Sequence, residues 1–323
     1  MKNFLYLLLL NFVFTAFQCE QSKKAESGQN EESQKNSAGY ADLSDTVRIH
    51  DHLKYLTKSD QFRNFQNVVR LDSVAAYIFR AFDQYADTTF YQEFEANGNV
   101  YRNVICSFGV NNSTRTVVGA HYDVCGAQEG ADDNASGVVG LLELARLLEA
   151  DTLSERIDLV AYTLEEPPFF RTEKMGSYIH AKSLVDENVC VNGMVCLEMI
   201  GYFDDSKGSQ QYPVGGMKAM YGSRGDYIAL VSQMGPGAFV KDFNKEFKKT
   251  KRIETKEIAA PKSMQGIDFS DHLNYWKFGF SALMVTDTAF FRNKHYHEKS
   301  DTMEKLDLER MSDVIDAVYL ALR

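Results

Sequence analysis

Histidine and carboxylate side chains follow directly on apolar stretches of the chain, and these are the residues that could do chemistry. The first are His121 and Asp123, which come after the apolar run 116–120. A carboxylate two residues after a histidine can accept the second ring N–H and fix the tautomer, an arrangement usual for metal-bound histidines. By itself the pair fits either a metal ligand or a hydrogen-bonded surface histidine in an acidic loop.

Three further apolar segments end in residues of the same type: Glu165 and Glu166 after 157–164, Glu198 after 194–197, and His295 and His297 in the loop after 281–287. Adjacent glutamates at a strand end point to opposite sides, so one could bind a metal while the other faces a substrate water. The carboxyl ends of the strands of an open α/β sheet gather where ligands bind. The pattern therefore predicts a metal site assembled at one sheet edge.

The periodicity of the remaining segments predicts the elements that position these residues. Apolar residues at helical spacing predict one or two amphipathic helices within 46–86, a core helix from about 136 to 150, and a further helix near 242–249. Alternation on both sides of Asn97 and Gly98 predicts a hairpin over 88–108. The alternation of strands and helices predicts an α/β fold.

The amino-terminal residues predict export. Lys2 and the short apolar run 4–17 are typical of a secretory signal and too short for a membrane span. Cys19 and the polar residues after it resemble a lipoprotein signal. We therefore expect residues 1–19 to be a signal peptide and residues 20–41 a disordered tether. The protein would be periplasmic or anchored to the outer membrane through lipidated Cys19, or secreted.

Composition and charge limit the partners. The chain is 44% hydrophobic and 25% charged, as expected for a globular domain, which we place at 42–323. A net charge of -10 disfavours nucleic acid and anionic membranes, so a membrane would be met only through the lipid anchor. Four more cysteines lack the close spacing of a zinc-thiolate site and are expected to be buried thiols with at most one disulfide: Cys106, Cys125, Cys190 and Cys196.

Five motifs in this order resemble peptidase family M28, the co-catalytic dizinc aminopeptidases: Gly-Ala-His-Tyr-Asp at 119–123, Gly-Ala-Asp-Asp-Asn-Ala-Ser-Gly at 130–137, Leu-Glu-Glu at 164–166, Leu-Glu-Met-Ile-Gly-Tyr at 197–202 and His-Glu-Lys-Ser-Asp-Thr at 297–302. The resemblance runs from about residue 116 to the carboxyl terminus. It implies a three-layer α/β sandwich with a mostly parallel, mixed central sheet of the zinc-exopeptidase type. It also implies two Zn²⁺ ions per chain.

The resemblance assigns a role to each site residue. The implied metal ligands are His121 and Glu198 on one ion, Glu166 and His297 on the other, and Asp133 as the bridge. The implied catalytic residues are Glu165, the general base that takes a proton from the attacking water, and Asp123 beside His121. The residues implied to support or line the site are Asp132, Asp301, Asp271, Tyr202 and His272, the last in the pocket wall.

These assignments predict a zinc-dependent exopeptidase that removes residues from the amino termini of peptides. Glutaminyl cyclisation is the alternative, because those enzymes keep one zinc and lengthen the segment after the glutamate pair, as this chain does over 167–175. His121 and Glu198 disfavour cyclisation, since they supply ligands for a second metal ion. A non-catalytic binding protein is disfavoured because all five ligands and the base are present. Cleavage of acyl-amino or carboxy-terminal bonds remains open.

Three features set this chain apart from the commonest family pattern or leave its specificity open. Glu198 stands where many members have aspartate. Residues 203–266 contain no motif that predicts a function, so the substrate side chain and the oligomeric state are not predicted. Phe169 and Phe170 are candidates for an apolar pocket wall, or for the core.

Overall fold

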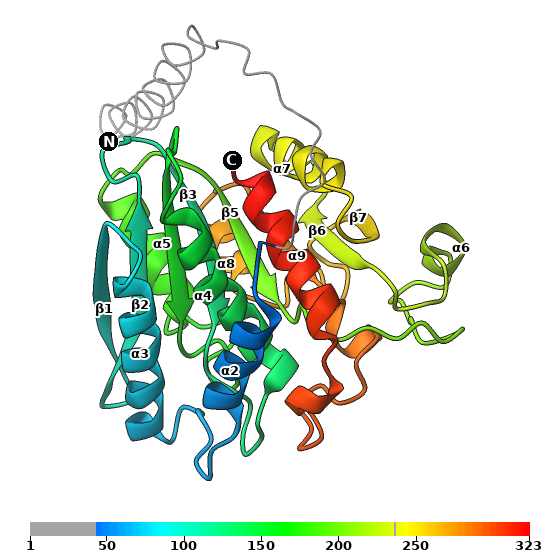
Figure 1. Ribbon diagram of the computed structural model, residues 1–323, viewed down its shortest axis with the longest axis horizontal. Helices are drawn as coiled ribbons and strands as arrows, with labels where there is room; N and C mark the ends of the chain where they lie inside the picture. Colours follow the sequence, from blue (N-terminus) through cyan, green and yellow to red (C-terminus); the bar gives the residue numbers. More distant parts are fainter. Residues whose placement is uncertain (1–42, 236) are drawn as a thin grey trace, which may run out of the picture.

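A computed structural model describes residues 43–235 and 237–323 (Figure 1). The predicted signal peptide, Cys19 and the predicted tether lie outside these residues. Among the helices of the described ranges, none combines the length and the apolar character that a membrane span needs.

An eight-stranded mixed sheet forms the centre of the fold, in the order β1-β2-β4-β3-β5-β8-β6-β7. Its strands are β1 Thr88–Ala96, β2 Asn99–Phe108, β3 Arg115–His121, β4 Arg156–Tyr162, β5 Val191–Glu198, β6 Ile228–Gln233, β7 Thr255–Ala260 and β8 Ala282–Thr286. The adjacent strands β4, β3, β5 and β8 run parallel to one another. Strands β2 and β6 pair antiparallel to β4 and β8 at the borders of this group. The four strands that precede the predicted site residues therefore end at one edge.

Helices cover both faces of the sheet (Figure 1). They are α2 Thr46–Thr57, α3 Val68–Asp83, α4 Gly137–Leu148, α5 Gly176–Asp186, α6 Met217–Tyr221, α7 Ala238–Lys249, α8 His272–Lys277 and α9 Leu308–Ala321. Alternate residues of a strand join opposite cores: Val118 of β3 packs in the cluster under α2, α3, α4, α7 and α9, and Val117 packs in the cluster under α5 and α8. The predicted three-layer α/β sandwich, the hairpin and the helices are confirmed.

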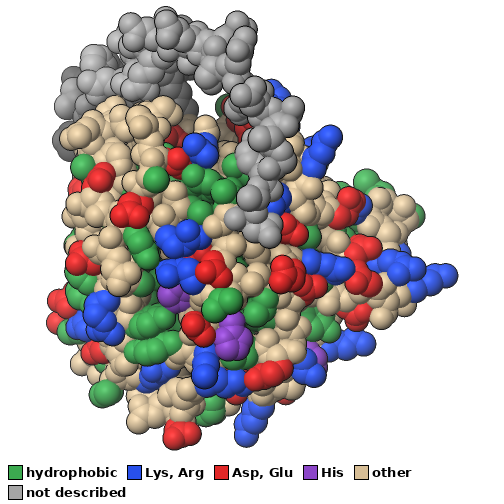
Figure 2. All heavy atoms as spheres, in the orientation of Figure 1, with side chains coloured by type: hydrophobic (Ala, Val, Ile, Leu, Met, Phe, Trp, Pro, Cys, Tyr) green, Lys and Arg blue, Asp and Glu red, His purple; other side chains and the backbone are tan. Residues whose placement is uncertain are grey.

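The face that carries α3, α4 and α9 has interspersed charges. Basic and acidic side chains alternate over its described part in Figure 2. This agrees with the mixed charged composition of a globular domain.

Residues 203–226, between β5 and β6, form an arm that the sequence did not predict, and β6, β7, α5, α8 and α9 were not predicted either. An isolated bridge joins Asp204 to Gly225 at the base of this arm. Its helix α6 buries none of its residues and projects from the body of the molecule in Figure 1. The arm returns the chain to β6 and contributes to the cavity described below.

Candidate metal centre

The end of β3 places His121 inside the molecule, and Asp123 joins it to the end of β4. His121 is 1% exposed, and its Nδ1 lies 3.6 Å from Asp123 Oδ1. The Asp123 carboxylate also accepts the backbone N–H groups of Glu165 and Glu166, each at 3.1 Å. The nearer partner of His121 Nδ1 is the backbone carbonyl oxygen of Asp123 at 3.2 Å, so Asp123 holds the imidazole through its backbone and the glutamate pair through its carboxylate. The His-x-Asp spacing predicted that the Asp123 carboxylate would accept the ring N–H, whereas its backbone carbonyl oxygen is the acceptor and the carboxylate lies farther away. The bonds to the glutamate pair were not predicted.

The loop before α4 places Asp133 between the two histidines. The Asp301 carboxylate accepts the backbone N–H groups of Asp132 at 3.0 Å and Asp133 at 3.1 Å. Asp133 Oδ1 lies 3.4 Å from His121 Nε2, and Asp133 Oδ2 lies 3.2 Å from His297 Nε2. Its two oxygens therefore face two different imidazoles, the position that a bridging carboxylate needs.

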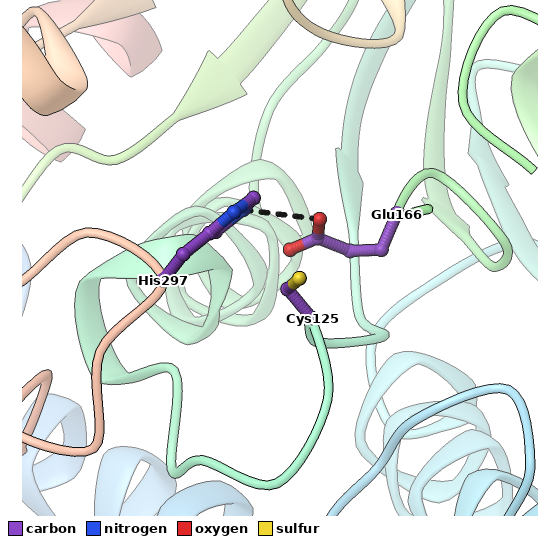
Figure 3. Close-up of side chains that lie close together, drawn as sticks. All are labelled: Cys125, Glu166 and His297. Carbon is purple, nitrogen blue, oxygen red and sulfur yellow. Dashed lines mark ion pairs between the residues drawn. The ribbon is translucent and has the colours of Figure 1, made fainter. Parts of the chain in front are cut away.

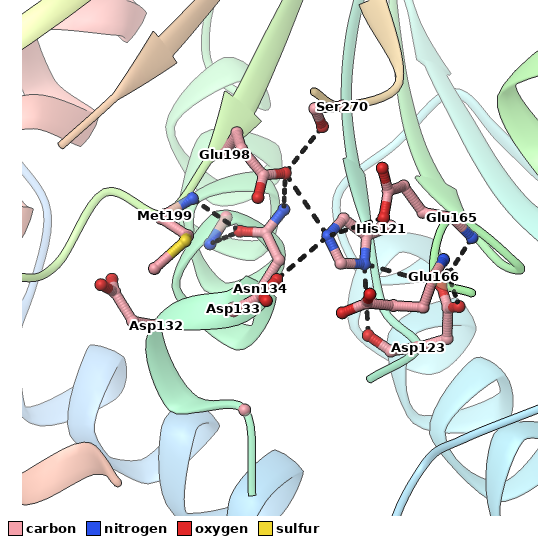
Figure 4. A network of polar contacts seen from close by, with 12 residues as sticks. His121, Asp123, Asp132, Asp133, Asn134, Glu165, Glu166, Glu198, Met199 and Ser270 are labelled. Carbon is pink, nitrogen blue, oxygen red and sulfur yellow. Dashed lines mark hydrogen bonds and ion pairs between the residues drawn. The ribbon is translucent and has the colours of Figure 1, made fainter. Parts of the chain in front are cut away.

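Asp132 has a separate, structural set of contacts. Its carboxylate accepts the backbone N–H of Gly201 at 3.1 Å and the side-chain amide of Asn293 at 2.7 Å. These bonds tie the loop before α4 to the segments that follow β5 and β8. Asp132 is fully buried and points away from His121 in Figure 4.

Glu198, at the end of β5, completes the side that contains His121 (Figure 4). Glu198 Oε2 lies 3.4 Å from His121 Nε2. The same oxygen accepts hydrogen bonds from Ser270 Oγ at 2.7 Å and Asn134 Nδ2 at 3.2 Å. These two donors hold the longer glutamate arm in place.

Glu166 and His297 lie on the other side of Asp133 from His121 and Glu198. Glu165 lies between these two sides. Glu166 Oε2 is 3.1 Å from His297 Nε2. Glu165 Oε2 is 3.9 Å from His121 Nε2. The structure therefore brings together all five predicted ligands and the predicted base. His295 is not among them, because its Nδ1 pairs with Ser300 Oγ at 2.8 Å.

The predicted ligands leave polar atoms without hydrogen-bond partners. Four such buried atoms are His121 Nε2, Asp133 Oδ2, Glu166 Oε1 and His297 Nε2. Buried polar atoms without partners are costly, and a bound cation would satisfy all four. Ligand atoms of His121, Asp133 and Glu198 lie within 4.8 Å of one another. Imidazole nitrogens and carboxylate oxygens in this arrangement fit Zn²⁺.

The pKa values of the site show the effect of crowding carboxyl groups in the interior. Burial raises the pKa of Glu165 well above its usual range, and it raises the pKa of Glu166 to about 7. Burial would lower the pKa of His297, but the neighbouring carboxylates of Asp133 and Glu166 raise it to about 10. Burial also raises the pKa of Asp301 to about 8. A cation in their midst would stabilise the charged carboxylates.

His272 differs from the pocket-wall prediction because it lies in the core, and Phe169 takes the core position that was one of its two predicted alternatives. His272 is fully buried, its Nε2 lies 2.8 Å from the carbonyl oxygen of Ile267, and its ring packs edge-on against Trp276. Phe169 is 4% exposed and belongs to the main hydrophobic core. Phe170 instead contacts Phe269 with ring centroids 5.9 Å apart.

The other two predicted pocket residues have distinct surroundings. The ring of half-buried Tyr202 packs against His295, with centroids 6.0 Å apart. Asp271 is fully buried, and neither of its carboxyl oxygens has a hydrogen-bond partner. Burial, the largest influence on it, raises its pKa to about 7. Neither residue lines the cavity described next.

A partly open, apolar cavity adjoins the site at Glu198. Its wall combines the arm, β6, β7, β8 and the loops before α8 and after β8, with side chains that include Met217, Val231, Ile258, Met264, Phe269 and Met284. Because these residues come from distant segments without a shared motif, the cavity could not be predicted from the sequence.

Sequence reasoning also missed residues next to the ligands. Ser270 and Asn134 contact Glu198, as described above. The ring of Tyr296 stacks on His297 with centroids 3.9 Å apart. Cys125 lies beside Glu166 and His297 (Figure 3). Cys125 and Asn134 belong to motif-bearing loops, and Tyr296 directly precedes a predicted ligand, so proximity in sequence was the available signal.

The cysteines partly confirm the sequence expectation. Cys106 and Cys196 are buried free thiols, and Cys125 is a half-buried free thiol. No bond therefore joins Cys190 to Cys196, the nearest pair in the sequence.

Comparison with known proteins agrees with the fold. Residues 103–322 match the profile of Peptidase family M28, and the chain belongs to this family, whose members depend on zinc. It is 40% identical over 278 residues to the Escherichia coli (strain K12) protein called uncharacterized protein YfbL. The match covers 84% of this chain and 85% of that protein.

Two solved structures illustrate the range of proteins with this fold. One is the LapA aminopeptidase of Legionella pneumophila, with a TM-score of 0.67, 20% identity, and coverage of 92% of this chain and 79% of that chain. The other is a glutaminyl cyclase of Porphyromonas gingivalis, with a TM-score of 0.66, 19% identity, and coverage of 87% and 99%. At these identities the likeness establishes the fold alone, and the choice between the two activities depends on the site.

Proposed function

We propose that this protein is a zinc-dependent aminopeptidase with two ions bound on either side of Asp133. The observation that carries the proposal is that both sides have a histidine and a glutamate in place. His121 and Glu198 face one oxygen of Asp133, and Glu166 and His297 face the other. A cyclase with a single zinc would need only one of these sides.

The residues around the ligands supply the proton transfers of peptide hydrolysis. Bound zinc would lower the pKa of a water molecule and polarise the scissile carbonyl. Glu165 would take the proton of the attacking water and return it to the departing amine. Burial raises the pKa of Glu165, which makes its carboxylate a stronger base. Asp123 orients Glu165 through the backbone N–H that it accepts.

The cavity next to Glu198 supports a preference for apolar amino-terminal residues. Glu198 lines the cavity, and the other wall residues named above are methionine, valine, isoleucine and phenylalanine. Burial of a leucine-sized or phenylalanine-sized side chain there would contribute about 1.5–3 kcal/mol. A charged side chain would lose its hydration without a partner among these residues.

Hydrolysis of aminoacyl anilides tests this proposal. The substrates are leucyl, phenylalanyl, glutamyl and lysyl anilides, each with a free and with an acylated amino group, assayed with and without a chelator. We expect chelator-sensitive cleavage of the free-amine leucyl and phenylalanyl compounds. Cleavage of the acylated series as well would contradict an aminopeptidase. Inactivity toward all anilides, with ring closure of amino-terminal glutamine, would establish the cyclase instead.

Glu165→Gln tests the base while keeping the size of the side chain. We expect kcat to fall roughly 10²–10⁴-fold with unchanged zinc content, because an amide cannot accept the proton. Glu173→Gln is the matched control, since Glu173 is exposed in the segment that follows the glutamate pair. Activity of Glu165→Gln equal to that of the control would exclude Glu165 as the base.

A further inference from the structure

A free thiol lies next to the Glu166–His297 side of the site. Figure 3 shows Cys125, from the loop after β3, facing the same space as Glu166 and His297. The sulfur of Cys125 and one ligand-type atom of each of the other two residues lie within 4.8 Å of one another. Sulfur, oxygen and nitrogen thus converge from three segments far apart in the sequence.

Two buried atoms of this group have no hydrogen-bond partner. Glu166 is 4% exposed, yet its Oε1 accepts no hydrogen bond. His297 Nε2 also has no hydrogen-bond partner. A cation between the three side chains would satisfy the carboxylate and the imidazole, and the sulfur is near enough to join them.

The loop holds Cys125 in position from both sides. The N–H of Val124 donates to the carbonyl oxygen of Arg63 at 3.1 Å. On the other side, Asn64 Nδ2 donates to the carbonyl oxygen of Gly126 at 2.7 Å. The backbone on each side of Cys125 is therefore anchored to the segment that links α2 and α3.

The other free thiols of the described residues lie elsewhere. Cys106 and Cys196 are fully buried within β2 and β5. Neither belongs to a group of metal-ligand side chains in the part of the chain that the structure describes. Cys125 thus differs from them in both exposure and surroundings.

We propose that Cys125 supplies a thiolate ligand to the ion held by Glu166 and His297. This inference rests on the metal-binding function proposed above and adds a donor to one side of the site. On binding, the S–H bond breaks, its proton passes to solvent and a sulfur–metal bond forms, without oxidation or reduction. A sulfur, nitrogen and oxygen donor set favours Zn²⁺, Co²⁺ or Cd²⁺ over Mg²⁺ and Mn²⁺.

Cobalt substitution tests the sulfur–metal bond directly. Metal-free protein is titrated with Co²⁺, and the near-ultraviolet thiolate-to-cobalt charge-transfer band is recorded for the wild type, Cys125→Ser and Cys106→Ala. We expect the band in the wild type and Cys106→Ala and its complete loss in Cys125→Ser, with folding checked by circular dichroism. A wild type that binds two cobalt ions without the band, or a band that persists in Cys125→Ser, overturns the proposal.

Alkylation of the unmodified protein gives a second measurement. Iodoacetamide should label Cys125 in the folded, metal-free protein, and stoichiometric Zn²⁺ should suppress this labelling. Cys106 and Cys196 should stay unlabelled in both states because they are buried. Equal labelling of Cys125 with and without zinc overturns the proposal.

The two proposals fail in different ways. Two bound cobalt ions and chelator-sensitive anilide hydrolysis, without the charge-transfer band, would reject the role of Cys125 and leave the aminopeptidase proposal intact. Absence of metal binding, with any hydrolysis insensitive to chelator, would reject both.

Discussion

The two sides of Asp133 differ in how the fold holds the predicted ligands. His121 and Glu198 end the neighbouring parallel strands β3 and β5, and each is at most 5% exposed. Glu166 and His297 lie in the loops after β4 and β8. The His297 side chain is 28% exposed, and its backbone has φ 57°. The first pair belongs to the sheet, which we call the strand side, and the second pair forms the loop side.

This difference indicates how firmly each side would hold an ion. Residues on strands are placed more precisely than residues on loops. A non-glycine residue with positive φ costs free energy and persists where its surroundings fix it, often at a functional site. We therefore expect the strand-side ion to be bound tightly and the loop-side ion to exchange more readily.

Substitution of Asp133, the bridging carboxylate, should release both ions and so abolish the difference between the strand side and the loop side. Asp133→Asn leaves His121 and His297 without the shared carboxylate charge, so we expect loss of both ions and a fall in activity of at least about 10²-fold. Metal analysis of purified protein and anilide hydrolysis measure the two effects. Asp60→Asn, at an exposed position, is the control. Retention of both ions in Asp133→Asn would exclude the bridging role.

Removal of one histidine at a time should separate the two sides. His297→Ala is expected to lose the loop-side ion and keep one ion per chain, because His121 and Glu198 remain. His121→Ala is expected to weaken the binding of both ions, since His121 Nε2 lies near Asp133, Glu198 and Glu165. Isothermal titration of the metal-free variants with Zn²⁺ counts the sites. Identical stoichiometries for the two variants would show that the sides are equivalent.

Protonation should oppose zinc binding on the loop side. In the metal-free protein, the charges of Asp133 and Glu166 outweigh burial and raise the pKa of His297 to about 10, so this ring carries a proton at neutral pH. Zinc must displace that proton, and a second one on Glu166 below pH of about 7. Affinity should therefore rise with pH, about tenfold per unit for each proton displaced.

Calorimetry in two buffers of different ionisation enthalpy measures this release. We expect at least one proton to leave per zinc ion at pH 8, and fewer in His297→Ala. Binding with the same affinity at pH 6 and pH 8 would contradict the proposed ligand.

The sequence predicted the parts of the molecule whose positions follow from a periodic pattern. Strands β3, β4, β5 and β8 were visible as apolar runs, and parallel strands bring their ends to one edge. The predicted site residues at these strand ends therefore meet in space. They are His121, Glu165, Glu166 and Glu198. Helices α2, α3, α4 and α7 followed from apolar residues at helical spacing, and the structure confirms them, whereas α5, α6, α8 and α9 were not predicted.

The sequence could not fix the direction of side chains in loops and short helices. His272 follows Asp271 in a Ser-Asp-His motif, but at the start of the six-residue α8 its ring faces the core at Trp276. Phe169 and Phe170 are adjacent, yet one packs in the core and the other contacts Phe269. Such differences depend on contacts between distant segments, for which no period exists. The contact of Ser270 with Glu198 is of the same kind.

The contact of Ser270 with Glu198 provides the mildest test of the comparison between the strand side and the loop side. Ser270→Ala removes the 2.7 Å hydrogen bond to Glu198 Oε2 and leaves the one from Asn134. Loss of a group that orients a metal ligand typically lowers affinity about 10–100-fold, and we expect the lower end because one donor remains. The loss should fall on the strand side alone, since Ser270 contacts neither Glu166 nor His297 by a hydrogen bond in the described residues. Competition with a zinc chelator measures both affinities, with Ser300→Ala as the control on the loop that carries His297. An equal loss on both sides would mean that the two ions are coupled through Asp133, and that the strand side and the loop side behave as one unit.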